Sequence, residues 1–117
     1  MTILFQPTEL RPSTHNVAIT ILEQLGGSRF RAMTGASGFL YGSDNNERPC
    51  LQFYFKGSRR ANHLTVHYER GMDEYTMTFL KIGNGWKDVK QVSTHTGVYF
   101  DQLQSIFKSV TGLDTHL

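Results

Sequence analysis

The sequence predicts an α+β domain: an antiparallel β-sheet meander of about five or six strands, with an N-terminal and a C-terminal helix packed on one face. Two observations predict this class. Hydrophobic residues recur with helical spacing near both ends of the chain, and they alternate with polar residues through its middle. Because single strands do not alternate with helices, a parallel doubly wound sheet is not expected. The length of 117 residues predicts a single domain over 1–117, with an extended N-terminal arm over 1–12.

Both helices are predicted by an apolar stripe and by a glycine at the end. Residues 13–25 carry apolar side chains at offsets of three and four, and Gly26 follows as a helix-ending residue. The same spacing returns over residues 99–110, and Gly112 is placed to end that helix. The C-terminal end of each helix is therefore marked in the sequence.

Strands are predicted where the apolar period falls to two. Residues 29–33 alternate Phe30 and Ala32 with Arg29 and Arg31, which indicates a first strand before the glycine-rich turn at 34–38. Further strands are expected at 39–41, 51–56, 63–69, 74–79 and, as a lysine-rich edge strand, 86–92. Packing the helices on the sheet is expected to bury Phe30, Phe53, Phe55, Val66, Tyr68, Met77 and Phe79 together.

Charge and cysteine content constrain the setting of the protein. Twelve Lys and Arg residues stand against ten Asp and Glu residues, so any binding of nucleic acid would depend on local clustering of charge. The single cysteine, Cys50, cannot form an internal disulfide, and no long apolar run or signal-like leader is present. We expect a cytoplasmic protein without membrane contact.

Several stretches of the chain together carry a family resemblance. They read ILEQLGG at 21–27, MTGA at 33–36, DEYTMTFLK at 73–81 and GVYFDQLQSIFKSVTGL at 97–113. This combination resembles a family of small uncharacterised proteins encoded by bacteriophages, prophages and plasmids, over about residues 20–117. The resemblance implies an origin in a mobile element and a location in the cytoplasm of a bacterial host cell. It carries over no catalytic or binding residue.

Metal binding and catalysis have weak support in the sequence. His63 and His67 share a strand face, but four residues of extended chain span about 13 Å, too far for both imidazoles to hold one ion. Cys50 could act as a nucleophile with His67 or His95 as its base, yet a small buried cysteine is the more common case. The turn at 34–38 lacks the lysine of a phosphate-binding loop. We therefore predict no metal, no cofactor and no enzymatic activity.

The candidate binding surface is the polar face of the predicted sheet. Residues that alternate away from the core there are basic, aromatic or imidazole side chains, and two arginines lie in the adjoining loop. Such a face suits phosphate contacts and base stacking, although a sheet with one solvated face must display polar residues in any case. The predicted partner-binding residues are Arg29, Arg31, Tyr54, Lys56, Arg59, Arg60 and His67.

These observations lead to two functional hypotheses from different classes. The first is a non-enzymatic accessory protein of a phage or other mobile element that binds nucleic acid through the open sheet face. The second is a protein-interaction module that inhibits a host enzyme or defence complex, suggested by the small size and the mobile-element resemblance. The sequence leaves the oligomeric state open, and an exposed edge strand would allow a dimer.

Overall fold

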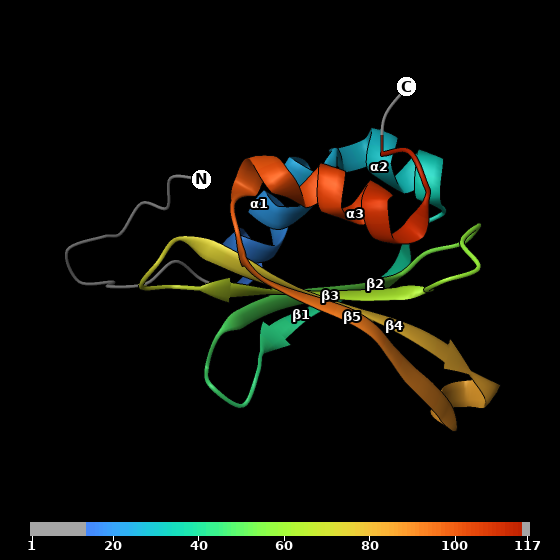
Figure 1. Ribbon diagram of the computed structural model, residues 1–117. Coiled ribbons are helices and arrows are strands. Elements are labelled where there is room, and N and C mark those ends of the chain that lie inside the picture. Colours follow the sequence, from blue (N-terminus) through green and yellow to red (C-terminus); the bar gives the residue numbers. More distant parts are fainter. Residues whose placement is uncertain (1–13, 116–117) are drawn as a thin grey trace.

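Five antiparallel strands form one open sheet, and the helices cover only one of its faces (Figure 1). The computed structural model describes residues 14–115, so the predicted N-terminal arm lies outside the described residues. The elements, in chain order, are α1 (Thr14–Leu25), α2 (Gly27–Thr34), β1 (Ser37–Ser43), β2 (Pro49–Tyr54), β3 (His63–Glu69), β4 (Glu74–Gly83), the 3-10 turn η1 (Asn84–Trp86), β5 (Asp88–Val98), the 3-10 turn η2 (Phe100–Gln102) and α3 (Leu103–Thr111).

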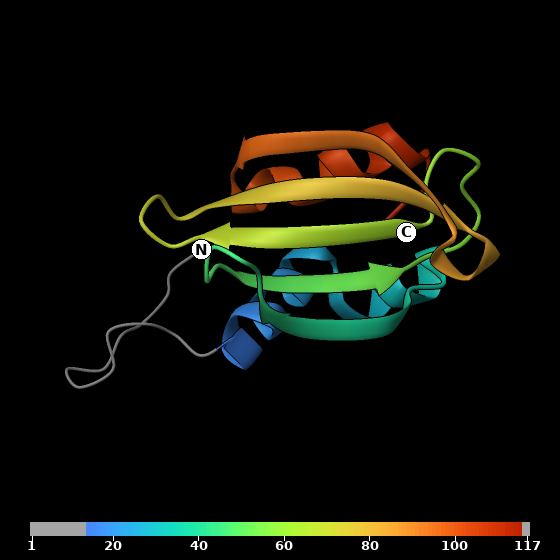
Figure 2. The ribbon, with the colours of Figure 1, turned by 90° about the horizontal axis from the view of Figure 1, so that it is seen from below.

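The strands follow one another across the sheet in chain order, β1-β2-β3-β4-β5 (Figure 2). This is the predicted antiparallel meander, and the prediction of the α+β class is confirmed. In a meander, successive turns lie at alternate ends of the sheet. The β2–β3 loop and the β4–β5 turn therefore share one end, and the β1–β2 loop and the β3–β4 turn share the other.

The hydrophobic core lies between the sheet and the three helices. Alternate side chains of β2, β3 and β4 point toward the helices, and the rings of Phe30, Phe53, Phe55, Phe79 and Phe107 contact one another there. All seven residues expected to share the core are buried. The period-two pattern thus predicts correctly which face of the sheet is covered.

The predicted first strand is wrong, because residues 27–34 form helix α2. Phe30 and Thr34 lie one helical turn apart and are both buried, whereas Ala32 is exposed. A single large apolar side chain in a short segment satisfies a strand pattern and a helix pattern alike, and here packing of Phe30 against Phe107 at 5.0 Å favours the helix. The glycine-rich segment at 34–38 consequently joins a helix to a strand, not two strands.

The glycines that end the helices take the expected backbone conformations. Gly112 ends α3 with φ 79° and donates its N–H to the Lys108 carbonyl at 2.7 Å. Gly26 separates α1 from α2 with φ 129°, a value that L side chains rarely adopt. The last predicted strand also needs adjustment, since Trp86 belongs to η1 and β5 begins at Asp88. β5 is an edge strand, as predicted.

Candidate functional site

The structure separates the predicted binding residues into three places. Tyr54 and His67 lie on the sheet face that carries no helix. Lys56 follows β2, and Arg59 and Arg60 lie in the β2–β3 loop at one end of the sheet. Arg29 and Arg31 project from α2 on the helical side, and the Arg31 guanidinium lies 5.3 Å from the Phe39 ring centroid. The predicted open-face surface containing all of them is therefore wrong, because it required 29–33 to be a strand.

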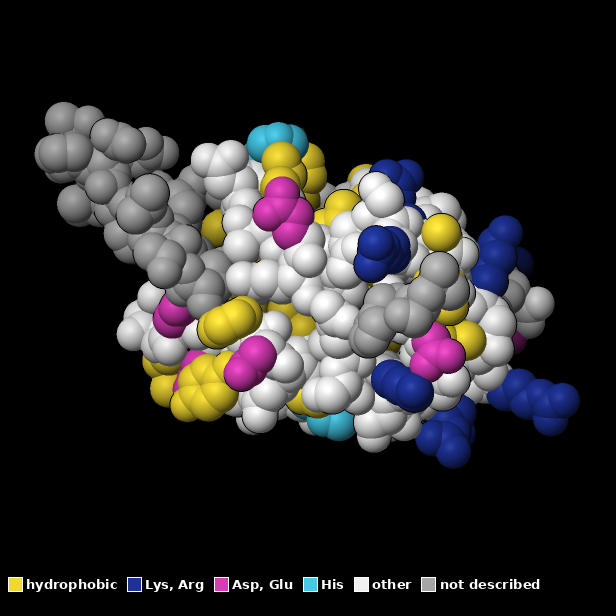
Figure 3. Space-filling model, turned by 90° about the horizontal axis from the view of Figure 1, so that it is seen from above, with side chains coloured by type: hydrophobic (Ala, Val, Ile, Leu, Met, Phe, Trp, Pro, Cys, Tyr) yellow, Lys and Arg dark blue, Asp and Glu magenta, His cyan; other side chains and the backbone are white. Residues whose placement is uncertain are grey.

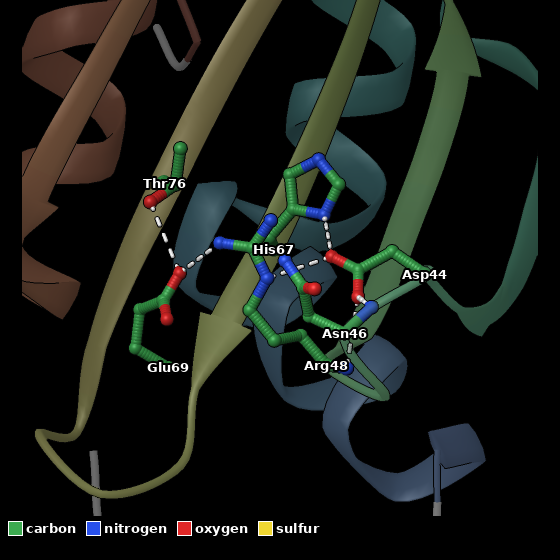
Figure 4. A network of polar contacts seen from close by, with 6 residues as sticks. All are labelled: Asp44, Asn46, Arg48, His67, Glu69 and Thr76. Carbon is green, nitrogen blue, oxygen red and sulfur yellow. Dashed lines mark hydrogen bonds and ion pairs between the residues drawn. The ribbon is translucent and has the colours of Figure 1, made fainter.

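His67 belongs to a polar network at the opposite end of the open face (Figure 4). Its Nδ1 lies 2.8 Å from Asp44 Oδ2, which also accepts a hydrogen bond from Arg48 Nε at 2.7 Å. The guanidinium of Arg48 reaches on to Glu69, whose carboxylate accepts a hydrogen bond from Thr76 at 3.2 Å. These contacts tie the β1–β2 loop to β3 and β4. His67 is thus held inside the network, and its side chain is only 17% exposed.

The network fixes the charges of its members. Burial opposes ionisation of Asp44, but N–H donors from the backbone of Arg48 and Asn46 and from the Arg48 side chain hold the pKa of its carboxyl below the ordinary value. Burial and the nearby Arg48 cation together lower the pKa of His67, in spite of Asp44. The imidazole is accordingly neutral at neutral pH, and it offers no positive charge to a phosphate.

His63 lies in an aromatic cluster on the open face, formed by Tyr54, His63 and Trp86. The ring centroid of His63 is 5.0 Å from that of Tyr54 and 5.3 Å from that of Trp86, with interplanar angles of 75° and 79°. Trp86 Nε1–H donates to the Tyr54 hydroxyl at 2.5 Å. The turn η1 carries Trp86 back over the sheet, so His63 is buried. The alternating pattern places His63 on the face away from the helices, as observed, but it holds no information about the turn that covers it.

Burial of His63 predicts a pH dependence of stability. Desolvation lowers the pKa of His63 in the folded state, whereas the unfolded chain keeps a value near 6.5. As the pH falls below about 6.5 the unfolded state binds the proton first, so the free energy of unfolding decreases with falling pH. We expect urea unfolding to give a lower free energy at pH 5.5 than at pH 7.5.

The variant His63→Gln is the control for this dependence. It removes the titrating group, so the loss of stability between pH 7.5 and pH 5.5 should shrink. Some loss remains, because the pKa of His67 is lowered as well and acts with the same sign. An identical pH dependence in the variant and the parent would show that His63 does not carry the effect.

The end of the sheet that carries the β2–β3 loop and the β4–β5 turn is strongly basic. We call its six cations the basic end: Lys56, Arg59, Arg60, Lys81, Lys87 and Lys90. Figure 3 shows Lys and Arg side chains gathered at the right, the end of the β2–β3 loop, with Asp and Glu mostly toward the left. Within residues 14–115, none of the six forms an ion pair. Although the net charge is only +2, the positive side chains are concentrated at one end of the molecule and most of the negative ones lie elsewhere.

Several members of the basic end line common hollows. Arg59, Arg60, Lys81 and Lys90 surround one of them together with Val92. Lys87 lines a neighbouring hollow that again includes Lys81 and Lys90, together with Asp88, whose carboxylate accepts a hydrogen bond from Asn84. Hydrogen bonds of Asn62 hold the loop to β4. Its N–H donates to the Leu80 carbonyl at 2.9 Å, and its side-chain amide donates to the Ile82 carbonyl and accepts from the Ile82 N–H, both at 2.8 Å. The cations are thus carried on ordered backbone at the rim of a concave surface.

Lys81 and Lys90 are direct cross-strand neighbours on β4 and β5. Like charges in that position destabilise a sheet. Replacing one of them, Lys81→Glu, should turn the repulsion into attraction and raise the free energy of unfolding by roughly 0.5 kcal/mol. Urea unfolding at low salt measures the change.

Lys108→Glu is a matched control for this prediction. Lys108 lies 2.8 Å from Asp114, so the same charge reversal there replaces an attraction by a repulsion and should lower stability slightly. If both variants shift stability in the same direction, net charge and not the Lys81–Lys90 pair governs the effect.

Other kinds of site find little support in the described part of the chain. Residues 14–115 contain no group of three His, Cys, Asp or Glu side chains arranged to hold a metal ion. No helix there is long and apolar enough to span a bilayer. Cys50 lies opposite His67 across β2 and β3, but burial and the Asp44 carboxylate raise the pKa of its thiol, which disfavours a nucleophilic thiolate.

The binding residues predicted from the sequence omit three members of the basic end, Lys81, Lys87 and Lys90. They also omit Trp86, which lies at the same end of the sheet. A usable signal was present, because alternate turns of a meander lie at the same end of the sheet. The predicted order of strands therefore already placed the loop with Arg59 and Arg60 beside the lysine-rich turn after β4. The contact of Trp86 with His63 had no comparable signal.

No protein-family model matches the chain, and no curated protein or solved structure was found to match it.

Proposed function

We propose that the protein is a non-enzymatic nucleic-acid-binding module of a bacteriophage or other mobile element, and that it contacts phosphates through the basic end. The observation that carries the proposal is the concentration of six cations, none of which forms an ion pair within the described part of the chain, with Lys81 and Lys90 directly opposed across the sheet. A bound polyanion would relieve this repulsion and release condensed counterions.

The proposal moves the interface from the open sheet face to one end of the sheet. Tyr54 stays within it, because β2 runs toward the basic end and Lys56 lies two residues further on. The Lys56 N–H is anchored to the Thr34 carbonyl at 2.8 Å, which fixes where this cation leaves the sheet. His67 lies in the network of Asp44, and we assign it a structural role.

The salt dependence of binding tests the proposal. If about five phosphates are neutralised, affinity for a labelled single strand should fall about 100-fold between 50 and 200 mM salt. Fluorescence anisotropy with single- and double-stranded DNA and RNA measures it. No binding to any of these probes at low salt would overturn the proposal.

A protein-interaction module is the second candidate, and a specific observation favours it. Tyr99 and Phe100 are about half exposed where the chain enters α3, and Phe100 lines a hollow with Gln24, Gln104 and Lys108. Exposed aromatic residues at a concave surface are typical of protein interfaces. Binding of a host protein through this surface would be lost in Phe100→Ala and would depend little on salt.

A further inference from the structure

Trp86 combines wide exposure with a fixed position. Its side chain is 48% exposed, yet its Nε1–H donates to the Tyr54 hydroxyl and its ring contacts both Tyr54 and His63. The backbone of Gly38 lies close to Tyr54, since a Cβ added there would approach the Tyr54 ring to 2.9 Å. The indole is therefore presented to solvent from a rigid support.

The backbone that presents Trp86 is strained. Asn84, Gly85 and Trp86 have φ values of 51°, 63° and 76°, in the left-handed region that large side chains rarely adopt. Such strain persists only when surrounding contacts enforce it, and it concentrates at functional sites. Here the hydrogen bond between Asn84 and Asp88 and the indole contact with Tyr54 maintain the turn.

Beneath Trp86, His63 supplies a second unusual feature. It is 1% exposed, and its Nδ1 is buried without a hydrogen-bond partner, whereas Nε2 lies 3.2 Å from Gln52 Oε1. An unpaired buried polar atom costs free energy, and this one has no exposed surface that a ligand could contact. His63 therefore contributes to the cluster by supporting the Trp86 ring from beneath.

Cations lie at the same end of the sheet as the aromatic cluster. Lys87 follows Trp86 directly, whereas Lys81 comes next to Leu80, the partner of His63, and therefore alternates to the other face of the sheet, where it opposes Lys90. An exposed indole followed by a lysine, at a sheet end that carries further cations, matches the pairing of stacking surface and phosphate contacts by which proteins hold single strands. A duplex buries the faces of its bases and cannot use the indole in this way.

We propose that the aromatic cluster of Tyr54, His63 and Trp86 is a stacking site for an unpaired base of single-stranded nucleic acid, with Trp86 as the surface on which the base lies. This inference rests on the proposed function, since the basic end holds the backbone on either side of the base. It adds the class of ligand: a single strand in preference to a duplex.

The experiment compares two probes of equal charge, a single strand of about twelve nucleotides and the same strand with abasic sites throughout. Trp86 is the only tryptophan, so its fluorescence reports directly on the site. We expect the normal strand to quench this fluorescence and to bind about tenfold more tightly than the abasic strand. Equal affinities and an unchanged emission would overturn the inference.

Variants of Trp86 give a second readout. Trp86→Ala should lower affinity for the normal strand about tenfold and leave affinity for the abasic strand unchanged, while Trp86→Phe should restore part of the loss. Equal weakening on both probes would mean that Trp86 only supports the fold of the basic end, and the inference would fall. Steeply salt-dependent binding of both probes without discrimination leaves the proposed function standing, whereas binding of neither overturns both.

Discussion

Replacing Arg59 and Arg60 together by glutamate is expected to lower affinity for single-stranded nucleic acid about 100-fold. Each arginine at a phosphate contributes a charge-assisted contact, and its loss costs roughly tenfold in affinity. The two residues line the same hollow as Lys81 and Lys90, so reversed charge there also repels the phosphates held by the lysines. The salt dependence of binding should become shallower as well, by about two phosphate equivalents. Anisotropy titrations at several salt concentrations measure both effects.

Arg29→Glu with Arg31→Glu is the matched control. It changes the net charge by the same amount, but both residues lie on α2 and neither lines a hollow of the basic end. We expect a loss of only a fewfold, through the long-range field that salt screens. If the two double variants weaken binding equally, the overall charge of the protein governs binding, and the basic end is not the interface.

The sheet could be predicted because its sequence pattern and its environment agree. In β2, β3 and β4 every second residue meets the helices, so alternation in the sequence records burial directly. The segment of α2 could not be assigned in the same way. Its eight residues contain one large buried side chain, Phe30, and the contact that decides its conformation comes from Phe107, far along the chain.

The candidate site could likewise be predicted only where local sequence determines the structure. The loop with Arg59 and Arg60 was recognisable as basic, since a run of polar residues between two strands predicts an exposed loop. Lys81 on β4 and Lys90 on β5 become neighbours of this loop only through the order of the strands. The predicted meander already implied that order. The position of Trp86 over His63 depends on three successive positive φ angles in η1. Only one of these three residues is a glycine, so composition indicates a turn but not its direction.

Phe107→Ala is expected to destabilise the fold by about 3–5 kcal/mol. Phe107 is fully buried, and its ring centroid lies 4.9 Å from that of Phe55 and 6.1 Å from that of Phe79. It thereby joins α3 to the chain that leaves β2 and to β4, in addition to its contact with Phe30. Small domains are stable by only about 5–15 kcal/mol, so this loss is a large share of the total. Urea unfolding followed by circular dichroism measures it.

Phe100→Ala tests whether burial is the cause. Phe100 belongs to η2, directly before α3, and its side chain is 48% exposed, so its removal leaves no comparable cavity and should cost below about 1 kcal/mol. Similar losses in both variants would mean that α3 is not packed around Phe107 as described.

The same two variants are expected to differ in nucleic-acid binding, because Phe55, which contacts Phe107, immediately precedes Lys56. A cavity at Phe107 loosens the support of that cation, so Phe107→Ala should weaken nucleic-acid binding beyond the unfolded fraction, whereas Phe100→Ala should leave it unchanged.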